Sequence, residues 1–125
     1  MRSTVSLAPS PALTGNANFR SLTVNSTAQE VLATSGNVVA ISVLNRHSAA
    51  IYVKLYDIAA ASVNPASSTP VQTLLVPASS QLIVRGSDCP WSFSTACAVR
   101  AVTDSGDTGT TAPGTLPIIE IETQA

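Results

Sequence analysis

The stretch "AIYVKLYDI" (residues 50–58) decides how the fold of this chain is interpreted. Two sets of side chains alternate along it, the apolar Ile51, Val53 and Leu55 and the amphipathic Tyr52, Lys54 and Tyr56. Alternation with a period of two is typical of a β-strand that buries one of its faces. We therefore predict a strand whose tyrosines and lysine face either a polar environment or another subunit.

Short apolar runs separated by turn residues continue in both directions from this stretch. We predict further strands in "SLTVN" (21–25), "EVLAT" (30–34), "VVAISVLN" (38–45), "VQTLLV" (71–76), "QLIVRG" (81–86), "FSTACAVRAVT" (93–103) and "LPIIEIET" (116–123). None of the segments has a convincing helical period. The spacing predicts an all-β fold, a β-sandwich or jelly-roll-like barrel of about eight short antiparallel strands.

The run 38–45 is apolar on both of its predicted faces, which is typical of a central strand. Strict alternation places Val39 and Ile41 on one face and Val38 on the other.

Two connections have the length of a hairpin turn. The strand 50–58 follows the run 38–45 closely enough to pair with it, and residues 77–80 link two further strands over a similar length. The last predicted strand is expected to lie at a sheet edge, where Glu120 and Glu122 would guard it against unwanted pairing.

The first 20 residues contain two prolines and a glycine and lack the period of a strand or a helix. We predict an extended N-terminal arm over 1–20 and a single β-sandwich domain over 21–125. The arm has no continuous apolar core of the kind found in secretory signals, so we expect a protein that is made and used without export.

The composition excludes several classes of partner. Hydrophobic residues make up 45% of the chain and charged residues 10%, and the formal net charge is −1. A basic footprint for nucleic acid is missing, so we expect no nucleic-acid partner. No run approaches the roughly 18 consecutive apolar residues of a membrane span, so we expect no membrane partner either.

Residues that could support catalysis or metal binding are sparse. His47 is the only histidine and lies in a predicted turn. Cys89 and Cys97 lack the spacing of a zinc or redox pair, and we expect both thiols to be free. Asp104 and Asp107 lie in a glycine-rich turn without the pattern of a calcium loop. We therefore expect no catalytic residues, no metal, no cofactor and no enzyme activity.

Aromatic and apolar residues offer candidate contacts instead. Tyr52, Tyr56 and Trp91 could form a platform for sugars, but tyrosines on a strand face are also common at protein interfaces, which is the interpretation we favour. The predicted interface residues are Tyr52, Lys54, Tyr56 and Trp91, with Leu7, Leu13 and Phe19 of the arm.

Several segments together resemble a known group of proteins: "YVKLYD" (52–57), "TPV" (69–71), "VPASS" (76–80), "FSTACAV" (93–99), "AVTD" (101–104) and "DTGTTAP" (107–113). They resemble small, low-charge β proteins encoded among the structural genes of tailed bacteriophages. The resemblance spans roughly residues 37–123 and carries no catalytic residue. It implies a component of the virion, made in the host cytoplasm.

Within that group we expect a capsid decoration or cement protein that stabilises the shell through non-covalent contacts. Its partners would be the major capsid protein or another virion protein, and further copies of itself, with a trimer favoured by symmetry. A neck, tail or fibre-base component is the alternative within the same class. A carbohydrate-binding module is the alternative from another class.

Overall fold

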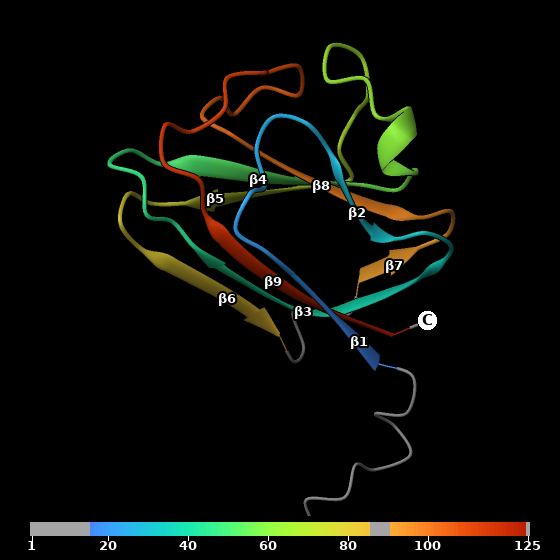
Figure 1. The fold of residues 1–125 in the computed structure, drawn as a ribbon. Coiled ribbons are helices and arrows are strands. Elements are labelled where there is room, and N and C mark those ends of the chain that lie inside the picture. Colours follow the sequence, from blue (N-terminus) through green and yellow to red (C-terminus); the bar gives the residue numbers. More distant parts are fainter. Residues whose placement is uncertain (1–15, 86–90, 125) are drawn as a thin grey trace, which may run out of the picture.

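The computed structural model describes residues 16–85 and 91–124 (Figure 1). Two antiparallel sheets pack face to face in this part of the chain, which confirms the predicted all-β sandwich. The strands are β1 (Asn16–Ser21), β2 (Gln29–Leu32), β3 (Gly36–Leu44), β4 (Ile51–Tyr56), β5 (Gln72–Val76), β6 (Gln81–Arg85), β7 (Trp91–Phe93), β8 (Cys97–Val102) and β9 (Ile118–Gln124), and a short 3₁₀ turn, η2, spans Ala60–Ser62.

The strand order is that of a jelly roll. Sheet A has the order β1-β9-β3-β6, with β7 also paired to β3, and sheet B has the order β2-β8-β4-β5. The first four strands pair in reverse order with the later ones, because β4 pairs with β5, β3 with β6 and β7, β2 with β8, and β1 with β9. One long antiparallel hairpin is thus rolled up, and the pairs β3–β9 and β4–β8 close the roll.

β6 and β7 run along the same edge of β3. β6 pairs with Ala40–Leu44 and β7 with Gly36–Val38, while β9 occupies the opposite edge of β3. The two short strands therefore act as one interrupted edge strand of sheet A, with residues 86–90 between them.

The core lies between the sheets and is made of aliphatic side chains from both. Ile51, Val53 and Leu55 of β4 are completely buried there, as the alternation predicted. The other buried members of the core cluster are Val24, Val38, Ile41, Val43, Val76, Phe93, Cys97, Val99, Ala101, Ile119 and Ile121.

The predicted faces of β3 are wrong at its N-terminal end. Val38 points into the core together with Ile41, although strict alternation placed them on opposite sides. The pairing of β3 with β9 shifts register between Val38 and Ala40, and such a bulge inserts a residue that reverses the alternation.

The two predicted hairpins are wrong as well. β3 and β5 are each followed by a strand in the opposite sheet, so both connections cross between the sheets. Asn45 holds the two crossings together: its Nδ2 donates to the carbonyls of Ala49 (3.0 Å), Val76 (3.1 Å) and Pro77 (3.0 Å). Its Oδ1 accepts from the backbone N–H of His47 at 2.8 Å. A connection of this length can form either a hairpin within one sheet or a crossing between the two sheets. Only long-range bonds such as those of Asn45 distinguish the two.

The boundary predicted at residue 20 falls inside β1 and is corrected by the structure. All six residues 16–21 pair with β9 and form one edge of sheet A. β9 consequently lies between β1 and β3 instead of at the expected edge. Leu7 and Leu13 lie outside the described residues.

Candidate interaction surface

The central part of the outer face of sheet B, around Lys54, Tyr56 and Arg100, is closed by the chain itself. Lys54 and Tyr56 of β4 and Arg100 of β8 point to this face, and all three have a relative exposure of 0%. Figure 1 shows the two long loops, residues 57–71 and 103–117, on the outer side of this sheet. Polar side chains on this face therefore bond to loops of the same chain.

Arg100 links three segments beneath this cover. Its Nε donates to the carbonyl of Ser26, its Nη1 to the hydroxyl of Tyr56 and its Nη2 to the carbonyl of Gly109, each at 2.7 Å. The guanidinium carbon also lies 5.9 Å from the centre of the Tyr56 ring, within the range of a cation–π contact. A buried cation needs this many acceptors, because an unpaired one would be strongly destabilising.

Lys54 lies beside Arg100 in the β4–β8 register and holds the same loop. Its Nζ donates to the carbonyl of Gly106. Burial and the neighbouring Arg100 charge lower the pKa of Lys54, and the carboxylates of Asp107 and Asp104 partly offset that effect. Lys54 and Arg100 together fasten residues 103–111 onto the sheet.

Asp57, directly after β4, holds the turn between β7 and β8. Its carboxylate accepts from the N–H of Ser94 (3.1 Å), Thr95 (2.9 Å) and Ala96 (3.3 Å), and from the Ser94 hydroxyl (2.9 Å). These bonds, that of Thr95 first, lower the pKa of Asp57. The segment 52–57 thus carries structural anchors for two distant turns.

The predicted exposed face of 50–58 is therefore corrected. Lys54 and Tyr56 are buried under the loops, so they are closed to a partner, and Tyr52 is half-buried. Trp91 of β7 and Phe19 of β1 belong to sheet A and pack against the core. The predicted contact residues that the structure describes do not gather on one surface, and the sugar platform of Tyr52, Tyr56 and Trp91 is not formed.

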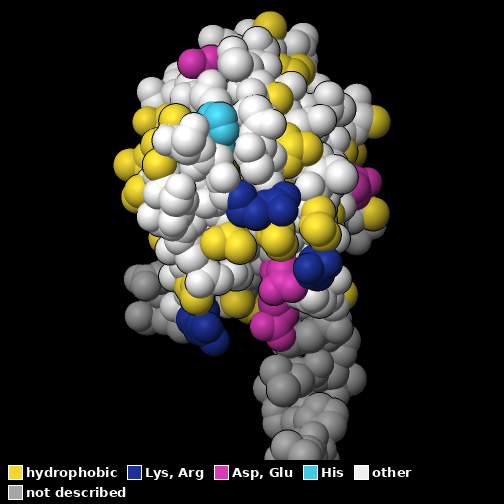
Figure 2. Space-filling model, turned by 60° about the vertical axis from the view of Figure 1, so that its left-hand side comes forward, with side chains coloured by type: hydrophobic (Ala, Val, Ile, Leu, Met, Phe, Trp, Pro, Cys, Tyr) yellow, Lys and Arg dark blue, Asp and Glu magenta, His cyan; other side chains and the backbone are white. Residues whose placement is uncertain are grey.

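The outer face of sheet A, in contrast, is open in the described chain. We call this surface the open face and define it by Asn18, Arg20, Leu22, Ala40, Ser42, Leu44, Gln81, Ile83, Arg85, Ile118, Glu120 and Glu122. It contains a shallow hollow of about 160 Å³, lined by Asn18, Ala40, Ile41, Ser42, Ile83, Arg85, Glu120 and Glu122. Figure 2 shows a row of hydrophobic side chains, with acidic groups below it and basic groups beside these.

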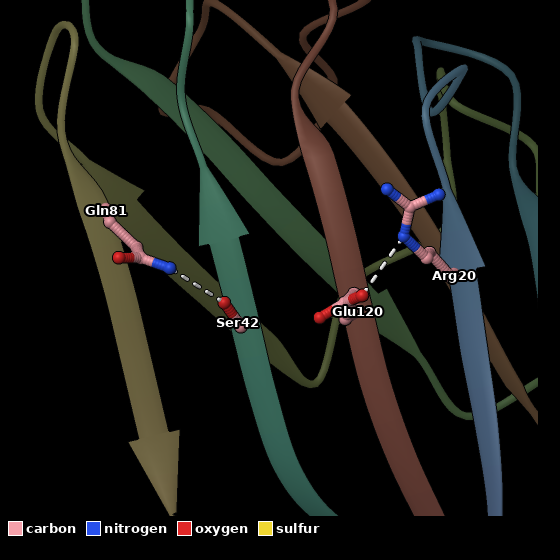
Figure 3. Close-up of polar contacts among 4 residues, drawn as sticks. All are labelled: Arg20, Ser42, Gln81 and Glu120. Carbon is pink, nitrogen blue, oxygen red and sulfur yellow. Dashed lines mark hydrogen bonds and ion pairs between the residues drawn. The ribbon is translucent and has the colours of Figure 1, made fainter.

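Polar contacts cross the open face from strand to strand (Figure 3). Arg20 of β1 and Glu120 of β9 form an ion pair with 3.1 Å between Nε and Oε2. Gln81 of β6 donates to the hydroxyl of Ser42 of β3 at 3.2 Å. About half of each ion-pair side chain is exposed (52% and 47%), so the pair adds little stability and remains accessible to a partner.

Apolar side chains accompany these polar groups on the open face. Leu22, at the end of β1, is 44% exposed, and Leu44 and Ile83 are 38% and 48% exposed. Sequence reasoning missed this surface because it placed β9 at an edge. The alternation of Glu120 and Glu122 with buried isoleucines was the signal that could have located it.

Groups with chemical reactivity are few in the described part of the chain. Cys97 is a free thiol in the core, and burial raises its pKa to about 12, so it is unreactive in the folded protein. Cys89 lies outside the described residues. His47 accepts a bond from the N–H of Thr115 at 3.4 Å. Among residues 16–85 and 91–124, acidic, histidine and cysteine side chains do not cluster as a metal site would require, and no helix is both long and apolar enough to cross a membrane.

Comparison with protein-family models, with curated proteins and with solved structures found no match for this chain. The fold, the open face and the resemblance of the segments named above are the observations that bear on its function.

Proposed function

We propose that this protein is a structural component of a bacteriophage particle, and within the particle a decoration or cement protein that binds the assembled capsid. The single observation that carries the proposal is the difference between the two sheet faces. The chain's own loops cover the outer face of sheet B at Lys54, Tyr56 and Arg100 and leave only its margin at β5 exposed, whereas the open face of sheet A combines exposed leucine and isoleucine with an ion pair and amide groups.

The chemistry of the open face supports a stable contact with another protein. Interfaces combine apolar contacts with hydrogen bonds, and the open face offers both. The low overall charge, with six basic and seven acidic residues, argues against long-range electrostatic attraction as the means of finding a partner. Binding to the assembled capsid of a virion through complementary surfaces requires no such attraction.

Quantitative mass spectrometry of purified particles tests the position of the protein. We expect a copy number comparable with that of the major capsid protein, because a decoration protein occupies the whole shell. A copy number that is a small fraction of this would transfer the proposal to the neck, tail or fibre base. Absence of the protein from particles would contradict a role in the virion.

The open face is tested by binding to purified capsids. Ile83→Glu places a third carboxylate near Glu120 and Glu122, and we expect it to lower occupancy strongly. Ala61→Glu, an exposed position in η2 on the other side of the sandwich, is the matched control and should bind normally. Equal occupancy of the two variants would show that the shell binds a different surface.

Carbohydrate binding is a second candidate, and the hollow in the open face is the observation that favours it. Asn18, Ser42 and Arg85 present amide, hydroxyl and guanidinium groups there, which can bond to sugar hydroxyls. Under this alternative Arg85→Ala would remove binding on a glycan array, whereas Tyr52→Ala would not.

A further inference from the structure

The edges of the two sheets differ in how well they are protected against pairing. An unpaired edge strand is a template for another strand, and proteins usually block it with charges, bulges or very short strands. β1 carries Arg20, the edge formed by β6 and β7 is interrupted and carries Arg85, and β2 is four residues long with a register shift and Glu30. β5 has no charged residue, and its pairing with β4 is continuous.

One side of β5 is not paired with any strand that the structure describes. β5 is the terminal strand of sheet B and pairs with β4 alone among the described strands. In an antiparallel edge strand, every second residue directs its N–H and C=O away from the sheet. Pro70 and Pro77 lack an N–H and bracket the strand, so any added ladder is confined to residues 71–76.

The exposed side chains along this edge are symmetric about Thr73. Val71 and Leu75, two residues to either side, are 57% and 53% exposed, the highest values among the large hydrophobic residues that the structure describes. Thr73 between them is also exposed. If a second copy pairs antiparallel to the first with the two Thr73 residues opposite each other, Leu75 of each copy lies against Val71 of the other. The same apolar contact therefore forms twice. An apolar–threonine–apolar pattern of this kind is complementary to itself.

We propose that two copies of this protein pair through β5 across a two-fold axis at Thr73, so that their two B sheets join into one continuous sheet. Self-pairing brings no like charges together, since residues 70–81 contain no charged side chain. The contact is isologous and gives a dimer, in place of the trimer expected from the resemblance. It goes beyond the proposed function and does not depend on it, because the protein alone in solution suffices to test it.

The test introduces a charge at residue 73, which lies opposite residue 73 of the second copy at the two-fold axis. Thr73 is exposed but lies directly opposite Lys54 of the same chain, so Thr73→Glu is expected to be the better tolerated of Thr73→Lys and Thr73→Glu in the monomer. In folded protein each should weaken self-association by about tenfold or more through like-charge repulsion at the axis. An equimolar mixture of the two variants should associate again as a heterodimer. The measurement is sedimentation velocity over a concentration series, with circular dichroism to check folding and Ala61→Lys, an exposed position outside β5 and outside the open face, as a control that should associate normally.

A covalent probe checks the register independently. In a Cys89→Ser background, Thr73→Cys should oxidise rapidly to a disulfide-linked dimer, because directly opposite Cα atoms lie about 4.5–5.5 Å apart in an antiparallel pair. A wild-type protein that is monomeric at all concentrations would overturn the proposal. So would a dimer or trimer that survives both charge substitutions, or a mixture of the two variants that fails to associate.

Discussion

Arg100 and Lys54 are neighbouring cations with different consequences for stability. Arg100 satisfies three acceptors at once, and these would lose their partner if it were replaced. Lys54 makes one bond to the loop and is opposed by the charge of Arg100. Both cations hold the loop, and we expect the loss of Arg100 to cost more stability than the loss of Lys54.

Substitution by methionine separates these two roles. We expect Arg100→Met to lower the free energy of unfolding by about 2–4 kcal/mol, because buried oxygens are left unbonded. Lys54→Met keeps a similar volume and removes a buried charge, so it should cost less than about 1 kcal/mol or stabilise the protein. Urea unfolding of both variants is the measurement. Equal losses would mean that Lys54 is an equal partner in holding the loop.

Asp57 makes stability depend on pH. Its pKa in the folded protein is lowered below the ordinary value of 3.8, so its contribution is fully present above that value and is lost as the pH falls through the folded pKa. Asp57→Asn should cost about 1–2 kcal/mol at pH 7. The gap between variant and wild type should narrow steadily in urea titrations below pH 4. A gap independent of pH would show that the carboxylate charge is not what holds the turn.

At the scale of elements, the loop 103–111 depends on one glycine. A Cβ at Gly109 would lie 2.4 Å from the Cβ of Asp104, too close to be accommodated without moving the backbone. The carbonyl of Gly109 is also an acceptor for Arg100, so a shift of this turn disturbs the closed face. Gly106, in the same loop, has open space around it.

The two glycines make a matched pair of variants. Gly109→Ala should destabilise the protein by roughly 1–3 kcal/mol, because the turn must move. Gly106→Ala should change stability by no more than about 0.5 kcal/mol. Thermal unfolding of both variants tests this, and a Gly106→Ala variant as unstable as Gly109→Ala would contradict the proposed packing of the turn.

How well these elements can be predicted depends on how far apart in the sequence the interacting residues lie. Alternation located β4 and its buried face, because that signal is local. It could not show that Lys54 and Tyr56 are buried, since Lys54 bonds to Gly106, 52 residues later, and Tyr56 to Arg100, 44 residues later. The bulge at Val38 and the crossing at Asn45 were missed for the same reason: each is defined by bonds to distant segments.

At the scale of the whole molecule, the rolled hairpin places its first and last strands, β1 and β9, side by side in the sheet that carries the open face. Phe19 of β1 packs against the core, so β1 is part of the sandwich and cannot be removed with the predicted arm. The alternation of Glu120 and Glu122 with buried isoleucines indicates one strand of the candidate surface, but the sequence does not show the other strands beside it, because the surface is assembled from four strands far apart in the chain. The sequence pattern located the strands themselves, but not their order.

Two deletions separate the predicted arm from β1. Deletion of residues 2–15 should leave the melting temperature nearly unchanged and, if the arm contacts the shell, abolish binding to capsids. Deletion of residues 2–21 removes β1 and uncovers β9, so we expect it to lower the melting temperature sharply. Full capsid occupancy by the shorter deletion would eliminate the arm as the anchor, while an equal loss of stability in both would contradict the assignment of β1.

The pairing of Asn16 with Gln124 places the two ends of the sandwich side by side. Directly opposite residues in antiparallel strands have Cα atoms only about 4.5–5.5 Å apart, so a linker of a few residues can join them. A circular permutant that omits residues 1–15, joins these ends and opens the chain between the exposed residues Ala66 and Ser67 should therefore retain the fold. A passenger domain fused at either end of the sandwich would also emerge at the same corner of the molecule.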